Sequence, residues 1–155
     1  MILEKDFNLN TFTHSDKADQ LGINNSDITD EQLQCLIDLH EVLVHIQGRL
    51  SIKFARPVQI QITSGFRSKE LNEKIGGVNK SQHSLGQACD STAIGISVED
   101  YFSLIKLLVQ EKVIEVDQCI NEKYEWVHLS FRKGNNRNQF LKMRIINGKT
   151  QYIPA

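Results

Sequence analysis

Apolar residues recur at helical spacing in two long stretches of the chain. Thr29, followed three positions later by Gln32, predicts a capping box, and apolar residues every three or four positions then predict an amphipathic helix. We expect this helix to end at Gly48 or at the residues before Pro57. Ser97 is a second N-cap candidate, and the residues after it predict another long helix.

Alternating and strand-like segments predict strands in the rest of the chain. Residues 58–62 alternate between apolar and polar side chains, and four further candidates lie at 117–122, 126–131, 141–146 and 149–153. Asn147-Gly148 between the last two predicts a tight hairpin, because a type I′ turn needs positive φ at both central residues. The order, helices first and then strands, predicts an α+β fold with a small antiparallel sheet packed with helices.

Length and composition favour a single domain with a small net charge. The 155 residues fit a single domain over 1–155, in which the polar residues 1–28 form an irregular N-terminal segment around a short helix near 15–21. The formal net charge is -1 and no basic block stands out, which argues against a nucleic-acid partner. No run approaches the roughly 18 apolar residues of a membrane span, and we expect a monomer.

Cysteine usage and the N-terminus predict a protein made in the cytoplasm. Cys35, Cys89 and Cys119 make an odd count without a C-x-x-C pair, which argues against a disulfide framework. The opening MILEKDFNLNTF lacks the basic and apolar regions of a signal peptide.

Two histidines and two carboxylates supply the candidate chemistry. His83 is followed seven residues later by Asp90, and His128 lies in a strand-like run with Glu125 three positions before it. Two imidazoles and one carboxylate make a three-ligand zinc set that leaves a fourth position open for water. The spare carboxylate, Glu125, is then available as the base for that water.

The strand period sets a condition on the base. Trp126, His128 and Ser130 share one strand face, so His128 has a rigid mounting. An offset of three residues points Glu125 to the opposite face of a regular strand. Glu125 must therefore lie at the strand entrance or at a bulge to reach the same site.

The other histidines and Cys89 have simpler interpretations. His14, His40 and His45 show no partnering pattern and are interpreted as structural or surface residues. Cys89 lies beside Asp90 and is an alternative nucleophile, but the strand alternation turns it away from the face of Asp90, which favours a small buried residue.

Four segments in order resemble a known family. SGFRS (64–68), LNEKIGG (71–77), SQHSLGQACD (81–90) and EWVH (125–128) are similar to the zinc D-Ala-D-Ala carboxypeptidase and L-alanyl-D-glutamate endopeptidase family, peptidase M15. The resemblance covers nearly the whole chain and implies a fold similar to the hedgehog signalling domain. It implies zinc as cofactor, with His83, Asp90 and His128 as its ligands.

The same resemblance implies the remaining site residues. Glu125 matches the general base of the family, and Arg67 matches the arginine that steadies the substrate and the developing oxyanion. Ser81 matches the serine near the substrate that heads the first ligand motif. A turn-anchoring role is the simpler interpretation of Arg67.

The resemblance implies a zinc peptidase that hydrolyses peptide bonds in peptidoglycan stem peptides. A small single domain without a signal peptide favours a phage endolysin, which reaches the cell wall through a holin-made lesion. A cytosolic D-Ala-D-Ala dipeptidase or carboxypeptidase, a non-catalytic zinc-containing wall-binding module, and a cysteine peptidase using Cys89 are the alternatives. The motifs are shared by carboxypeptidases and endopeptidases and leave the scissile bond open.

Overall fold

Helices and a single sheet make up the chain, for which the computed structural model describes residues 1–155. The helices are α1 (Leu9–Thr13), α2 (Asp16–Leu21), α3 (Asp30–Lys53), α4 (Lys69–Lys74) and α5 (Val98–Gln110), with a short 3-10 helix, η1 (Gln82–Leu85). The strands are β1 (Ile60–Ser64), β2 (Ala88–Ala93), β3 (Gln118–Glu122), β4 (Trp126–Ser130), β5 (Gln139–Ile146) and β6 (Lys149–Pro154). The predicted α+β single-domain fold is confirmed.

The sheet is antiparallel except for one pair of strands. Its order is β1-β2-β4-β3-β5-β6, and β5 runs parallel to β3. The sequence predicted an antiparallel sheet throughout. The difference arises because both edges of β4 are already paired, one with β2 and the other with β3. Strand β5 runs antiparallel to β4 but pairs with the free edge of β3, and it is therefore parallel to β3.

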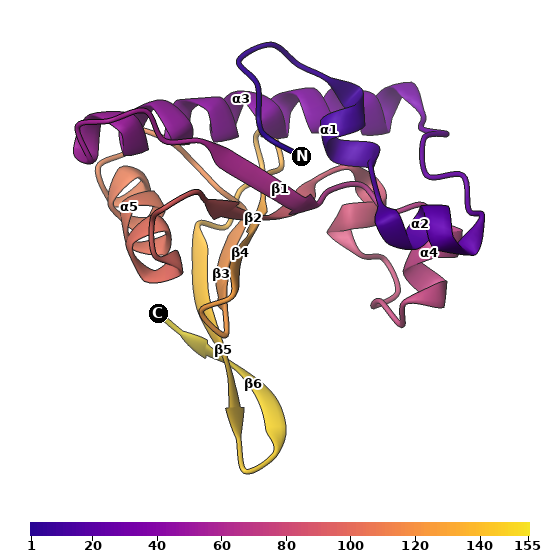
Figure 1. Cartoon of the computed structure of the whole chain (residues 1–155). Coiled ribbons are helices and arrows are strands. Elements are labelled where there is room, and N and C mark those ends of the chain that lie inside the picture. The colour runs from indigo at the N-terminus through magenta and orange to yellow at the C-terminus, as the bar shows by residue number, and fades with distance from the viewer.

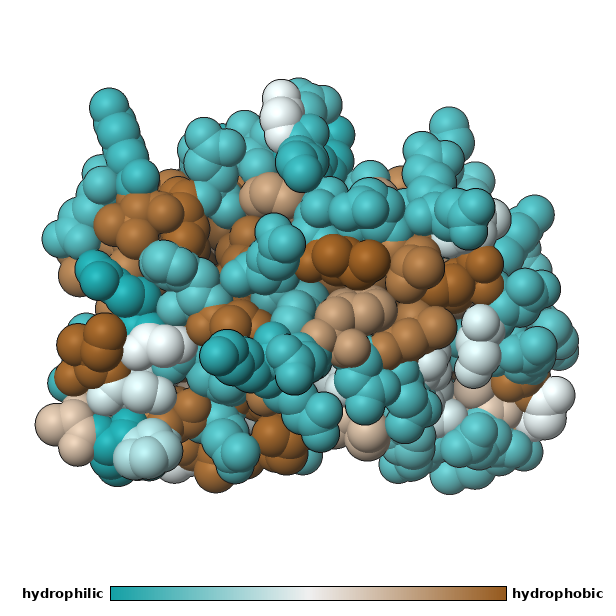
Figure 2. All heavy atoms as spheres, turned by 90° about the horizontal axis from the view of Figure 1, so that it is seen from above, coloured by the Kyte–Doolittle hydropathy of each residue, from teal (hydrophilic) through white to brown (hydrophobic).

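The long helix α3 lies across the top of the sheet (Figure 1). The predicted capping box is present. The Thr29 hydroxyl accepts from the backbone N–H of Gln32 at 3.1 Å, and the Gln32 side chain accepts from the backbone N–H of Thr29 at 2.8 Å. The helix runs past Gly48 to Lys53, because Leu50 continues the buried face and its burial outweighs the helix-weakening effect of glycine. From above, mostly hydrophilic side chains cover this side, with hydrophobic ones in small groups between them (Figure 2).

The two faces of the sheet differ. Cys89, Val127 and Leu129 on one face are fully buried in a 22-residue core that also takes the apolar residues of α3 and α5. The alternate positions on the same strands place Asp90 and His128 on the other face, where they pair across β2 and β4. The core thus fixes the strands whose other face carries the candidate chemistry.

The terminal segments flank this framework. Helix α2, capped by Ser15, lies where a short helix was expected, whereas α1 was not anticipated from the sequence. At the other end, Asn147 and Gly148 have φ of 52° and 72°, which confirms the predicted hairpin turn. The β5–β6 hairpin projects away from the body of the molecule (Figure 1). None of the helices has the length and apolar character that a membrane crossing requires.

Candidate metal centre and cleft

Three side chains from three elements converge on the open face of the sheet. His83 comes from η1, Asp90 from β2 and His128 from β4. Asp90 Oδ1 lies 3.5 Å from His83 Nε2 and 2.9 Å from His128 Nδ1. The three ligand atoms all lie within 4.8 Å of one another, so the group can hold a metal ion.

Hydrogen bonding sets His83 in a form suited to a cation. Its Nδ1 lies 2.7 Å from the carbonyl oxygen of Gly65. Because a carbonyl only accepts, Nδ1 carries the proton and Nε2 presents its lone pair toward Asp90. Two ligand atoms that each lie about 2.0–2.1 Å from a tetrahedral zinc ion are roughly 3.3 Å apart. The distances from Asp90 Oδ1 to the two histidine nitrogens, 2.9 and 3.5 Å, lie on either side of that value. The donor set therefore fits zinc.

The charges of the three groups follow from burial and hydrogen bonds. Burial lowers the pKa of His83 and keeps its imidazole neutral at pH 7. Burial opposes the charge on Asp90, but the hydrogen bond from His128 and the neighbouring ring of His83 outweigh it and hold the pKa of Asp90 well below its ordinary value. Neutral imidazole and ionised carboxylate are the forms that bind a cation.

Arg67 flanks the three converging residues. Its Nη2 lies 3.6 Å from Asp90 Oδ2, and its backbone N–H donates to the carbonyl oxygen of His83 at 3.3 Å. Burial lowers the pKa of Arg67, although a guanidinium stays charged at any physiological pH. Its Nε is buried without a hydrogen-bond partner inside the chain. Because Arg67 also lines the cleft, its guanidinium is placed to meet a bound anion.

The loop that carries Arg67 is held by the N-terminal segment. A Cβ on Gly65 would lie 2.8 Å from Cα of Phe12, so only glycine permits this approach. The buried amide of Asn25 donates to Phe66 O at 2.9 Å and accepts from Ser68 N at 2.7 Å. Sequence reasoning missed Asn25, because nothing in its own neighbourhood signals contacts more than 40 residues away.

Ser81 supports the turn of the first ligand loop. It is buried, caps η1 by accepting from the backbone N–H of His83 at 3.3 Å, and lines the cleft. The next residue, Gln82, donates from Nε2 to Asp117 Oδ2 at 2.9 Å. Asp117, whose side chain is fully buried, thus ties the ligand loop to the start of β3.

Asp117 is the centre of a charged network that the sequence did not reveal. Arg137 donates to it from Nε and Nη2 at 2.9 and 2.7 Å, and Arg132 donates at 2.8 Å. Burial opposes the charge, but these hydrogen bonds and that of Gln82 keep the pKa of Asp117 well below its ordinary value. The network joins β3, η1 and the loop between β4 and β5.

The two glutamates near His128 occupy different environments. Glu125 lies directly before β4, at the strand entrance that the sequence required, and its backbone N–H donates to Glu122 O at 2.9 Å. Its side chain is exposed and lies outside the residues that line the cleft. Glu122 is buried, lines the cleft and pairs with Trp126, so it shares the sheet face of His128.

Glu122 is the carboxylate that sequence reasoning missed. Burial raises its pKa, while the charges of His128 and Asp90 act on it in opposite directions. The alternation of Gln118, Ile120 and Glu122 along β3 is the signal that could have found it, once the register with β4 is known. The EWVH spacing drew attention to Glu125 instead.

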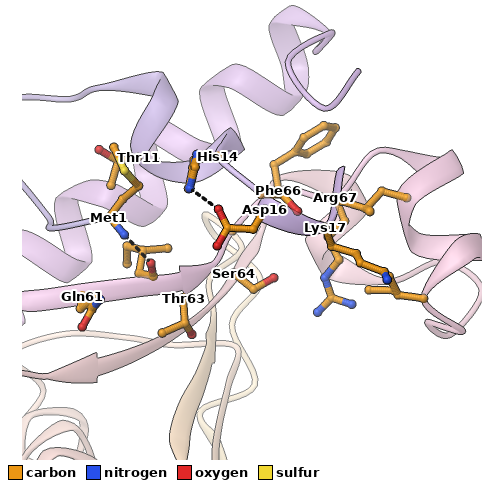
Figure 3. Close-up of a pocket in the computed structure, with 15 residues that line it drawn as sticks. Met1, Thr11, His14, Asp16, Lys17, Gln61, Thr63, Ser64, Phe66 and Arg67 are labelled. Carbon is orange, nitrogen blue, oxygen red and sulfur yellow. Dashed lines mark hydrogen bonds and ion pairs between the residues drawn. The ribbon is translucent and has the colours of Figure 1, made fainter. Parts of the chain in front are cut away.

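A cleft of about 710 Å³ surrounds the converging side chains. Trp126 is half-buried and lines this cleft. Cys89 is fully buried and faces the core, as predicted. A second hollow of about 420 Å³ lies beside the N-terminal segment (Figure 3), where His14 Nε2 lies 3.0 Å from Asp16 Oδ1. Arg67 borders both hollows.

Comparison with known proteins supports the sequence motifs. The family model for peptidase M15 matches residues 5–130 of this chain. Neither the curated proteins nor the solved structures give a match. The matched range includes the converging histidines and aspartate as well as Arg67, and it covers most of the chain. The chain therefore belongs to the peptidase M15 family and is a peptidase of the metal-dependent kind.

Proposed function

We propose that this protein is a zinc peptidase that hydrolyses peptide bonds in peptidoglycan stem peptides. The observation that carries the proposal is the convergence of His83 Nε2, Asp90 Oδ1 and His128 Nδ1 in an open cleft. Three protein ligands are typical of a catalytic zinc site, whereas a structural site takes four. This ligand count favours an enzyme over a non-catalytic wall-binding module.

The protein side chains position and polarise the substrate around that centre. A zinc ion held there would lower the pKa of a coordinated water toward ~7 and polarise the scissile carbonyl. Arg67 lines the same cleft, and its guanidinium suits either the developing oxyanion or a carboxylate of the stem peptide. Ser81 holds the ligand loop at the cleft wall.

The geometry favours Glu122 over Glu125 as the group that accepts the proton of the attacking water. Glu122 lies in the cleft on the sheet face of His128, and its raised pKa brings it closer to neutral pH, where proton transfer in both directions is efficient. Glu125 lies exposed in the turn. Glu125 remains the assignment implied by the sequence motif, so a test must treat both residues.

The size of the cleft favours a stem peptide over a free dipeptide. A cavity of about 710 Å³ lies within the range that accommodates drug-sized ligands, which corresponds to several peptide residues. We therefore favour action on the cell wall, as an endolysin released through a holin-made lesion, over a cytosolic D-Ala-D-Ala dipeptidase.

Matched variants of the two glutamates test the mechanism. Purified wild type, Glu122→Gln and Glu125→Gln, each loaded with zinc, would be incubated with peptidoglycan, and the fragments would be measured by mass spectrometry. We expect Glu122→Gln to bind zinc and to lose at least about 100-fold in rate, whereas Glu125→Gln stays within about threefold of wild type. The reverse result would return the base to Glu125. Absence of cleaved peptide bonds with the wild type would refute the proposed function.

A further inference from the structure

The β5–β6 hairpin brings a tyrosine to the cleft from outside the region that matches the family. The matched residues end at 130, and the hairpin follows at 139–154. Glu122 pairs with Met143 on β5, and Met143 pairs with Tyr152 on β6. Directly paired residues share a sheet face, so Tyr152 lies on the face that carries Glu122.

Tyr152 lies across the cleft from Arg67. The sheet order puts β1, which leads into Arg67, at one edge and β6 at the other, with the strands of Asp90 and His128 between them. Both Arg67 and Tyr152 line the cleft. The candidate metal ligands therefore lie between a cation on one wall and a phenol on the other.

Contacts to the body of the molecule hold the base of the hairpin in place. Lys142 Nζ lies 3.1 Å from Glu99 Oε1 on α5. The ring of Phe140 packs edge-on against Phe102 in the core, with ring centroids 5.7 Å apart. The tip of the hairpin projects from the molecule (Figure 1), but these contacts hold the part of its strands that borders the cleft against the body. A binding residue on such strands is held in a fixed position.

The environment of Tyr152 makes its hydroxyl a hydrogen-bond donor. Burial raises the pKa of the phenol, and the negative charges of Glu122 and Asp90 raise it further, so it stays protonated at neutral pH. The residue is exposed, with a relative exposure of 52%, which leaves it accessible to a molecule in the cleft.

We propose that Tyr152 is a substrate-binding residue, whose hydroxyl donates a hydrogen bond to a carbonyl or carboxylate oxygen of the stem peptide on the wall opposite Arg67. This inference rests on the proposed function and adds a second anchoring point to it. The C-terminal hairpin then belongs to the substrate site.

The test compares two tyrosine-to-phenylalanine variants. Tyr152→Phe removes the hydroxyl from the cleft. Tyr124→Phe is the matched control, because Tyr124 is similarly exposed at 56%, stacks on Arg144 at 3.9 Å and lies outside the cleft lining. The kinetics would be measured with a soluble peptidoglycan stem pentapeptide, which ends in D-Ala-D-Ala and so offers both candidate bonds, together with zinc content and thermal unfolding of each variant.

We expect Tyr152→Phe to raise KM about 2- to 10-fold, because the substrate loses one hydrogen bond, and to change kcat little. Zinc content, unfolding temperature and the kinetics of Tyr124→Phe should remain those of the wild type. Equal KM in both variants and the wild type would overturn the role of Tyr152 while leaving the proposed function intact. A wild type that neither binds nor cleaves the pentapeptide would overturn both. If the wild type binds it without cleavage, weaker binding by Tyr152→Phe would support the role of Tyr152, and equal affinity would overturn it.

Discussion

Replacement of Asp117 by asparagine tests the network behind the first ligand loop. Oδ1 accepts from Arg132 and Arg137, and Oδ2 accepts from Gln82 and Arg137. Asparagine keeps one oxygen and turns an NH₂ toward the other donors, so about two charge-assisted hydrogen bonds are lost, at about 1.5–3 kcal/mol each. Because Arg137 is 49% exposed and can bind water instead, we expect a net loss of about 2–4 kcal/mol.

The effect of Asp117→Asn depends on pH in a predictable direction. The folded pKa of Asp117 is depressed, so its stabilisation is fully present above the unfolded value of about 3.9 and is lost as pH falls toward the folded value. The difference in unfolding free energy between wild type and variant should therefore be largest near neutral pH and shrink below about pH 4.

Urea unfolding at several pH values measures this difference. Asp27→Asn is the control, because Asp27 is exposed and its replacement should change stability by less than about 0.5 kcal/mol. Since Asp117 also holds the residue before His83, Asp117→Asn should weaken zinc binding by about 10-fold. A variant as stable as the wild type at pH 7, or a difference that does not change with pH, would refute this role of Asp117.

Three further predictions concern the loop, the thiols and the guanidinium. Gly65→Ala should destabilise the fold by about 1–3 kcal/mol, because the added Cβ meets the backbone of Phe12; an unchanged thermal unfolding temperature would contradict this. A thiol alkylator should not slow wall cleavage through Cys89 or Cys119, since both are fully buried and burial raises the pKa of both thiols; modification of Cys89 that tracks loss of activity would favour a cysteine peptidase. Arg67→Ala should lower kcat by about 10²–10³-fold with zinc content unchanged, and near-normal turnover would leave the arginine only a structural role.

Local sequence signals predicted much of the fold. Thr29 and Gln32 form the capping box they predicted, and Asn147-Gly148 forms the hairpin turn, because each depends only on residues a few positions apart. The parallel pairing of β3 with β5 depends on which strand edges remain free, and that is a property of the assembled sheet. Helix α1 has only five residues and too little periodicity to be predicted.

The site divides in the same way. Motif spacing singled out His83, Asp90 and His128, and the structure brings these three together; their binding of zinc stays a prediction. Glu122 and Tyr152 reach the cleft only through the register of four strands, which no short motif encodes. Long-range contacts, such as those of Asn25 and Asp117, are equally invisible in a single sequence.

Titration of metal-stripped protein with zinc, with release of peptidoglycan fragments as the readout, tests the central claim most directly. Stripped wild type should release no cleaved stem peptides, and activity should rise in proportion to added zinc and level off at about one ion per chain, as one three-ligand catalytic site requires. His128→Ala should remain inactive over the same range. Full activity of the stripped protein, or equal activation of His128→Ala, would contradict a zinc peptidase built on these residues.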